Sequence, residues 1–236
     1  MTRLIAHRGA HAEHTENSLD AFAAALEQGA AGVELDVRHC ASGEVVVCHD
    51  PDLRRVAGRA TVVEETSWQS LREIELSCGG TIPLLDHALD LVIGGGAMVN
   101  IEIKGDVRGR RRLAAAVAHL LTRRSAAERD AAFISSFDPV VLIALRARRC
   151  SVPLGLLFDA AHTGPMRAAM LTRTLSVDAY HPHHALCTAS AVARWRRRGR
   201  AVHAWTVNDL TEAARLRGLG VDSIITDDIP ALRSVV

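Results

Sequence analysis

Residues 32–37, Gly-Val-Glu-Leu-Asp-Val, place two carboxylates inside a short apolar run. Residues 99–104, Val-Asn-Ile-Glu-Ile-Lys, repeat the arrangement with Glu102 and Lys104. Both runs have the β-branched content of a buried strand, and on a strand the side chains at i and i+2 share a face. Each run therefore directs two charged groups into one interior. Because an unpaired buried charge is costly, this set predicts a metal ion or an ionic ligand.

Strand-like and helix-like segments alternate along the whole chain of 236 residues. The strands that we expect are residues 4–6, 32–37, 99–103, 132–135, 154–158, 177–180, 201–207 and 223–226. Helix patterns fill the gaps, such as the apolar positions from Leu19 to Leu26 and the cap-proline pair Asp138-Pro139.

Eight such units predict an α/β fold, a closed (β/α)₈ barrel that spans residues 1–236 as a single domain. A doubly wound open sheet is the alternative. It is disfavoured because no glycine-rich phosphate loop follows the first strand.

One stretch departs from this alternation. Residues 45–48 form a further strand, which we interpret as the arm of a hairpin because only a short turn at Ser42-Gly43 precedes it. A hairpin centred on that turn predicts residue 49 opposite residue 36, which brings His49 near Asp36. Residues 50–81 are too long for a simple loop and carry one weak helix over 67–73. We expect them to form a small insertion over the barrel mouth.

Composition excludes some functions. The formal net charge of +1 leaves no basic footprint for nucleic acid, and the arginine runs at 108–112 and 196–198 are typical of solvated helix surface. Five cysteines without CxxC spacing, with no signal peptide and no long apolar segment, favour a reduced cytoplasmic protein without stable membrane association. Composition leaves the oligomeric state open.

Charged and titratable residues gather at the carboxyl ends of the predicted strands, where barrel enzymes carry their active sites. These residues are His7, Arg8, Glu34, Asp36, His49, Glu102 and Lys104. Three carboxylates without a cysteine ligand favour a hard cation, Mg²⁺ or Ca²⁺. With that ion and the two basic side chains, the site would carry about one positive charge, which suits a monoanionic phosphodiester. Two histidines could then act as acid and base.

Structural interpretations compete with these roles. A lone histidine at a strand end is usually structural, and Glu34 with Asp36 could belong to a buried ion-pair network. The tract His181-Pro182-His183-His184 is interpreted as a loop with solvated histidines rather than a metal site. Trp205 fits either barrel packing or a pocket wall. The joint set of strand-end residues is far harder to explain by chance than any member alone.

These motifs resemble, in order and spacing, the glycerophosphodiester phosphodiesterase family, most closely its short cytoplasmic bacterial members. The matching segments are residues 7–9, 15–18, 34–37, 49–50, 101–104, 135–138, 205–208 and 220–227. The resemblance implies an irregular (β/α)₈ TIM barrel with a small insertion after the second strand. It implies a phosphoric diester hydrolase that uses a divalent cation to convert glycerophosphodiesters into sn-glycerol 3-phosphate and an alcohol.

The resemblance also implies roles by position. Glu34, Asp36 and Glu102 would hold the metal, and His7 with His49 would be the acid-base pair. The substrate-binding candidates are Arg8 and Lys104 on the phosphate, Glu16 at an acidic position that orients its neighbours, and Trp205. In the mechanism usually proposed for the family, the glycerol 2-hydroxyl attacks phosphorus and the cyclic phosphate is then hydrolysed.

The chain departs from the family pattern at two places: the first alters the loop before a helix without removing any chemistry, and the second concerns substrate preference rather than the class of reaction. Thr15 stands where the family usually has proline, and residues 55–58, Arg-Val-Ala-Gly, replace a common threonine–asparagine–glycine stretch. Two other functions therefore stay open beside a small-molecule phosphodiesterase. One is a lysophospholipase D that acts on single-chain lipids, and the other is a non-catalytic barrel that binds phosphorylated ligands.

Overall fold

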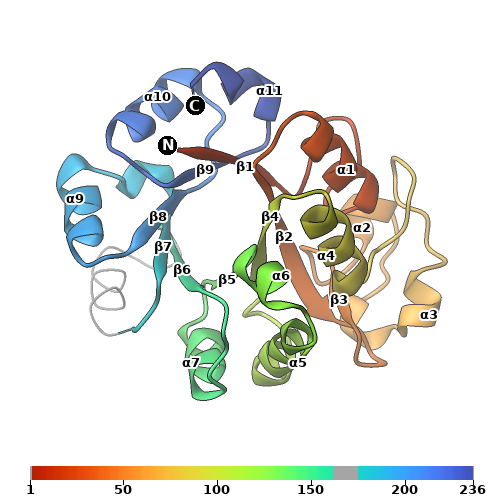
Figure 1. Cartoon of the computed structure of the whole chain (residues 1–236). Coiled ribbons are helices and arrows are strands. Elements are labelled where there is room, and N and C mark those ends of the chain that lie inside the picture. Colours follow the sequence, from red (N-terminus) through yellow and green to blue (C-terminus); the bar gives the residue numbers. More distant parts are fainter. Residues whose placement is uncertain (1, 162–174, 236) are drawn as a thin grey trace.

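In the computed structural model, which describes residues 2–161 and 175–235, eight parallel strands close into a barrel (Figure 1). The barrel strands are β1 (Arg3–His7), β2 (Gly32–His39), β4 (Met98–Ile103), β5 (Ala132–Ser136), β6 (Leu154–Phe158), β7 (Ala179–Pro182), β8 (Ala201–Ala204) and β9 (Ser223–Thr226). Neighbouring strands pair in the order β1-β9-β8-β7-β6-β5-β4-β2, and pairing of β1 with β2 closes the ring. The predicted TIM barrel is confirmed, and the open sheet is excluded.

Helices surround the barrel strands (Figure 1). They are α1 (Leu19–Glu27), α4 (Leu85–Gly94), α5 (Arg110–Thr122), α6 (Ala126–Asp130), α7 (Pro139–Ala147), α9 (Ala189–Arg197), α10 (Leu210–Gly218) and α11 (Ile229–Leu232), with 3₁₀ turns η2 (His184–Leu186) and η3 (Arg233–Val235). The Ser18 and Asp138 side chains cap α1 and α7, each accepting a hydrogen bond from a backbone N–H of the first turn. In the described part of the chain, no helix combines the length and apolar character that crossing a bilayer requires.

Alternation along β2 divides the strand between two environments. Val33, Leu35 and Val37 are fully buried in the apolar core, whereas Glu34 and Asp36 occupy the intervening positions on the barrel's inner face. The first residue of the strand is Gly32, and a glycine is required there because a Cβ would lie 2.6 Å from the carbonyl oxygen of Met98 on the adjacent strand. The sequence of β2 therefore sets both the close packing of the barrel wall and the side on which its carboxylates lie.

The predicted hairpin exists, but its predicted register is wrong by one residue. Strand β3 (Val45–Val47) pairs antiparallel with β2, with Val37 opposite Val47, and the backbone N–H of Cys48 donates to the carbonyl of Asp36. The turn is longer than the assumed two residues, because Cys40 and Glu44 still pair across it. Residue 48, not 49, thus lies opposite residue 36.

Strand ends also differ from the sequence prediction. Residues 177 and 178 precede β7, and residues 205–207 follow β8 rather than extending it. The expected weak helix over 67–73 is the shorter α3 (Trp68–Leu71), which Ser67 caps. These differences arise at element ends, where capping and tertiary contacts rather than hydrophobic period decide the boundary.

Residues 50–81 contain α2 (Arg54–Ala57), η1 (Val63–Glu65) and α3. Their apolar side chains pack with one side of the hairpin in a cluster of their own, apart from the main core. The members include Leu53, Val56, Val63 and Leu71, all buried. The apolar residues of this segment thus stabilise the segment itself by packing within this cluster.

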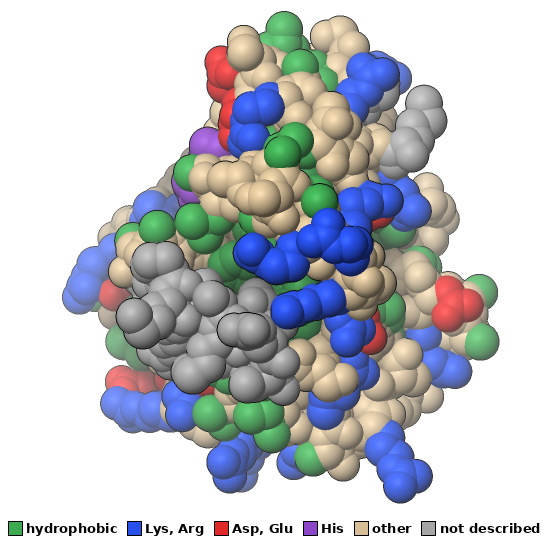
Figure 2. Space-filling model, turned by 90° about the vertical axis from the view of Figure 1, so that its left-hand side faces the viewer, with side chains coloured by type: hydrophobic (Ala, Val, Ile, Leu, Met, Phe, Trp, Pro, Cys, Tyr) green, Lys and Arg blue, Asp and Glu red, His purple; other side chains and the backbone are tan. Residues whose placement is uncertain are grey.

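The basic runs are exposed, but Arg110 is more than solvated surface, because its Nε lies 3.0 Å from Asp138 Oδ2. Arginines 196–198 on α9 and its end, and those at 108 and 110–112 around the start of α5, all face solvent. Figure 2 shows arginine side chains standing out over one face of the molecule.

Candidate active site

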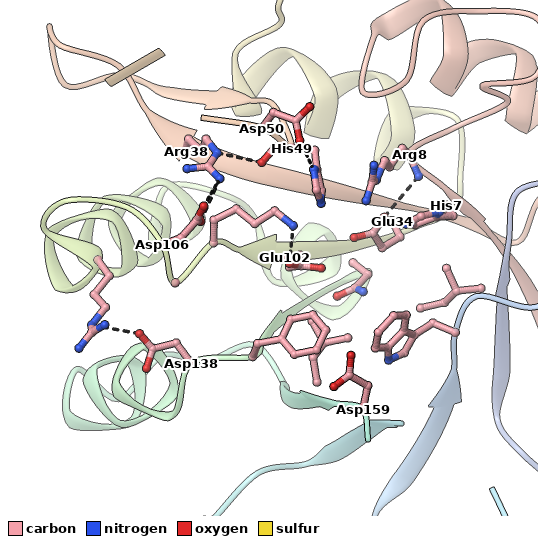
Figure 3. A pocket seen from close by; sticks show the side chains of 18 of the residues that line it. His7, Arg8, Glu34, Arg38, His49, Asp50, Glu102, Asp106, Asp138 and Asp159 are labelled. Atoms are coloured by element: carbon pink, nitrogen blue, oxygen red, sulfur yellow. Dashed lines mark hydrogen bonds and ion pairs between the residues drawn. The ribbon is translucent and has the colours of Figure 1, made fainter. Parts of the chain in front are cut away.

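A cavity of about 860 Å³ opens at the carboxyl ends of the barrel strands. Seven of the predicted site residues line it, namely His7, Arg8, Glu34, His49, Glu102, Lys104 and Trp205. Figure 3 shows His7, Arg8, Glu34 and His49 along one side of this cavity and Asp138 and Asp159 along the other. Residues that are far apart in the sequence thus meet at one mouth.

Three buried carboxylates form the centre of the site. Glu34 and Asp36 come from β2 and Glu102 comes from β4, with exposed fractions of 3%, 1% and 8%. The β2–β4 register sets Asp36 directly beside Glu102. One oxygen of each of the three carboxylates lies within 4.8 Å of the other two. This spacing is compatible with one shared cation.

Two basic side chains compensate part of this negative charge. Lys104 Nζ lies 2.7 Å from Asp36 Oδ1 and 2.7 Å from Glu102 Oε1. Arg8 Nε lies 3.1 Å from Asp36 Oδ2. Burial alone would raise the pKa of Asp36, but Lys104 and Arg8 outweigh it and hold that pKa well below its ordinary value. Burial opposes the charge on Lys104 too, yet Asp36 and Glu102 raise its pKa.

Of the three carboxylates, Glu34 has its negative charge least compensated by basic side chains. Burial, and next the charges of Asp36 and Glu102, raise its pKa well above the ordinary value. Two basic groups do not neutralise three carboxylates, and the donors are oxygens only. Both observations fit a hard divalent cation held by Glu34, Asp36 and Glu102.

The loop after β1 is built around these carboxylates. Arg8 and Gly9 both have positive φ, +56° and +83°, and a Cβ on Gly9 would lie 2.7 Å from the backbone of Ala21. The turn directs the Arg8 backbone N–H to the Glu34 carbonyl at 2.9 Å and to its Oε2 at 3.3 Å. Asn17, also at positive φ, donates to Asp36 Oδ2 and accepts from the Asp36 backbone N–H.

Each candidate catalytic histidine is hydrogen-bonded to a carboxylate. His7 Nδ1 lies 2.6 Å from Asp227 Oδ1, and its Nε2 points toward the carboxylate cluster, 4.0 Å from Glu34 Oε2. His49 Nδ1 lies 2.6 Å from Asp50 Oδ1. In both rings an Nδ1–H that donates to the acid leaves Nε2 available for proton transfer. No role was predicted from the sequence for Asp227 or Asp50. Their positions could have indicated one, because Asp227 directly follows the last barrel strand and Asp50 directly follows His49.

Glu16 lies beside the site rather than in the cavity lining. It accepts hydrogen bonds from the guanidinium groups of Arg8, at 3.0 Å, and Arg55, at 2.9 Å. Arg55 also donates from Nε to Asp50 Oδ2 at 2.7 Å. Burial opposes ionisation of Glu16, but the two arginines lower its pKa. A continuous chain of ion pairs therefore joins Arg8 to the aspartate that holds His49.

The opposite wall is more apolar. Trp205 packs edge-on against Phe137 with ring centroids 5.4 Å apart, and its Nε1 donates to the His181 carbonyl at 2.7 Å. Of the two interpretations left open for Trp205, the structure supports the pocket wall. Asn100, for which no role was predicted, lines the cavity with both amide atoms buried and without a hydrogen-bond partner.

The interpretation of the histidine tract as a solvated loop is wrong for its first member. His181 belongs to β7 and is fully buried inside the barrel, with its ring 4.7 Å from that of His203. Burial, and next the neighbouring His203, lower its pKa well below the ordinary value. His183 and His184 follow the strand, and His184 Nδ1 lies 2.7 Å from Glu212 Oε1.

Comparison with known proteins agrees with this geometry. The family model described as "Glycerophosphoryl diester phosphodiesterase family" matches residues 7–231. The chain belongs to this family. A glycerophosphodiester phosphodiesterase of Caldanaerobacter subterraneus subsp. tengcongensis is 28% identical over 242 residues, covering 100% of this chain and 98% of the relative. A Bacillus altitudinis protein of the same name is 29% identical over 238 residues, covering 96% and 95%.

Solved structures of the family share the fold. The Thermotoga maritima glycerophosphodiester phosphodiesterase superposes with a TM-score of 0.82 at 29% identity, covering 100% of this chain and 99% of that one. A phosphodiesterase of Oleispira antarctica, in complex with the product sn-glycerol-3-phosphate, gives 0.87 at 24% identity and covers 100% and 96%. The family match makes this protein a phosphoric diester hydrolase with glycerophosphodiester phosphodiesterase activity.

Removing Lys104 should destabilise the metal-free protein strongly, because Asp36 and Glu102 would stay buried without their shared counter-charge. We expect Lys104→Met to lower the free energy of unfolding by about 3 kcal/mol, measured by urea denaturation in EDTA. Arg54→Met is the control: that side chain is 71% exposed in its ion pair with Asp52, so it should cost less than about 1 kcal/mol. Equal losses would show that Lys104 does not carry this compensation.

Proposed function

We propose that the enzyme hydrolyses glycerophosphodiesters to sn-glycerol 3-phosphate and an alcohol with one divalent cation, Mg²⁺ or Ca²⁺. Glu34, Asp36 and Glu102 would hold the ion. The observation that carries the proposal is the meeting of these buried carboxylates, two basic side chains and two carboxylate-oriented histidines at one cavity. The product named in the Oleispira antarctica complex is the one expected of this reaction.

The chain's own residues supply binding and proton transfer. Arg8 and Lys104 line the cavity beside the carboxylates and would neutralise the phosphodiester. The bound cation would add further stabilisation of charge on the phosphoryl oxygens. One of the imidazoles of His7 and His49 accepts the proton of the attacking hydroxyl, and the other protonates the departing alcohol oxygen. Asp227 and Asp50 act as positioning residues that keep each ring in one tautomer.

The expected order of bonds follows from this pair. The substrate's glycerol 2-hydroxyl forms a bond to phosphorus while the bond from phosphorus to the alcohol breaks, which gives a cyclic phosphate. The histidines then carry the opposite protonation states. Water opens the cyclic phosphate as one ring takes its proton and the other returns one to the 2-oxygen, which restores the starting states.

The segment 50–81 would restrict the substrate to small headgroups. Only Asp50 and Pro51 of this segment line the cavity. Its apolar side chains, among them Leu53, Val56 and Leu71, are buried in their own cluster and offer no wall for an acyl chain. Extraction of a lipid from a membrane would require such a wall, at about 0.8 kcal/mol per buried CH₂.

Cytoplasmic location remains a prediction of the sequence.

The function is tested by turnover with and without EDTA. We expect glycerophosphocholine and glycerophosphoethanolamine to release glycerol 3-phosphate only when Mg²⁺ or Ca²⁺ is supplied, because three carboxylates that are only partly compensated would otherwise repel the phosphodiester. Lysophosphatidylcholine at equal concentration, below its micelle threshold, should react more slowly. Faster lysolipid turnover would favour the lysophospholipase D alternative, and binding without turnover would favour the non-catalytic one.

Glu102→Gln should lose most of the affinity for the divalent cation, since one of three anionic ligands becomes neutral. Calorimetric titration measures the affinity, and circular dichroism checks that the variant stays folded. Glu73→Gln provides the control, because that side chain is 73% exposed in an unrelated surface pair. If Glu102→Gln binds the cation as tightly as wild type, the ligand assignment is wrong.

His7→Ala and His49→Ala should each reduce kcat on the order of 100-fold, because each removes one proton-transfer group. The double variant should lose less than the product of the two, since the rings act as a unit. His87→Ala, an exposed histidine on α4, is the control for a generic histidine effect. Strictly multiplicative losses would indicate independent roles.

A further inference from the structure

A second group of metal-binding side chains lies on the far side of His7 from the carboxylates. Asp227 Oδ1 is 2.6 Å from His7 Nδ1 and 2.9 Å from His11 Nε2. One ligand atom from each of these three residues lies within 4.8 Å of the others. In the described part of the chain, this group and the carboxylate cluster are the two sets with such spacing. The function assigned above uses His7 and Asp227 but leaves His11 without a role.

The donor types separate the two sets chemically. Two imidazole nitrogens and one carboxylate oxygen are ligands for Zn²⁺ and similar transition ions, whereas an oxygen-only set suits Mg²⁺ or Ca²⁺. The side chains are accessible, with exposed fractions of 21% for His7, 28% for His11 and 31% for Asp227. An ion can therefore enter from solvent, and water can complete a tetrahedral shell.

We propose that His7, His11 and Asp227 form an inhibitory transition-metal site, occupied by Zn²⁺ through His7 Nδ1, His11 Nε2 and an Asp227 oxygen. Asn208 supports the carboxylate from behind, because its Nδ2 donates to Asp227 Oδ2 at 2.6 Å. Such outer partners orient metal-binding groups and are typical of metal sites. The Asp227 oxygen that faces both rings is thereby aimed at the point between them.

Occupation of this site withdraws His7 from proton transfer. Coordination takes the Nδ1 lone pair, so the ring proton must reside on Nε2, the nitrogen that faces Glu34. A neutral ring with Nε2 protonated cannot accept a proton, which His7 must do in one of the two proposed steps whichever histidine begins as the base. Zinc thus inhibits without displacing the catalytic cation from Glu34, Asp36 and Glu102. The inhibition rests on the proposed role of His7, but the binding does not.

Zinc binding is measured by calorimetry in saturating Mg²⁺. A Cys78→Ser background removes the exposed thiol that could bind zinc by itself. We expect one zinc ion per chain at this site, with at least a ~10-fold weaker affinity after His11→Asn. His14→Asn is the matched control, a histidine of the same loop outside this group, and it should bind zinc as the parent does. Co²⁺ in place of Zn²⁺ should give tetrahedral visible absorption that His11→Asn removes.

Activity provides the second measurement, with each variant compared with its own zinc-free rate. The parent and His14→Asn should be inhibited over the zinc range that fills the site, and His11→Asn should need at least a ~10-fold higher zinc concentration. Equal zinc affinity of His11→Asn and its parent would show that the proposed zinc site is wrong and that Asp227 only makes hydrogen bonds to its neighbours. Zinc bound through His11 without inhibition would overturn the inhibitory role. Absence of turnover in zinc-free enzyme would count against the proposed function alone.

Discussion

Compensation of buried negative charge at the barrel mouth is the constraint on which the active site depends. Three carboxylates lie almost out of contact with solvent, and Lys104 bridges two of them while Arg8 reaches Asp36. Breaking such a pair by removing one partner leaves a buried charge, which costs far more than an exposed pair contributes. The charge of Glu34 remains the least compensated, so the three carboxylates do not form a closed ion-pair network and are compatible with a shared cation.

Lys104 is the only lysine of the chain, and apart from histidine the other basic residues are all arginine. The difference fits its position. An ammonium is a compact point charge with rotatable donors and can sit 2.7 Å from carboxylates on two adjacent strands. A planar guanidinium is suited to bidentate pairing, as Arg55 pairs with Glu16 beside the site. The geometry between Asp36 and Glu102 therefore selects lysine even in a chain that otherwise uses arginine.

The barrel and the metal-binding candidates could be predicted because both depend on the local alternation of apolar and polar residues. Alternation along β2 and β4 sets which side chains face inward. Parallel strands then bring their carboxyl ends together at one edge. The hairpin register was missed because it depends on turn length, which the pair Ser42-Gly43 did not fix. Buried His181 was missed because a polar tract gives no sign of barrel interior. The roles of Asp227 and Arg55 depend on contacts between distant segments, which no period encodes.

Closure of the barrel and completion of the active site are one event. Strand β1 pairs with β2 on one side and β9 on the other, so the last strand pairing joins the two ends of the chain. The β1–β9 pairing brings Asp227, directly after β9, to His7 at the end of β1, while the β1–β2 pairing places Glu34 at the other edge of that ring. The β1–β2 register sets His7 beside Glu34. An unclosed sheet would thus keep its carboxylates on β2 and β4 but leave His7 without the aspartate that orients it.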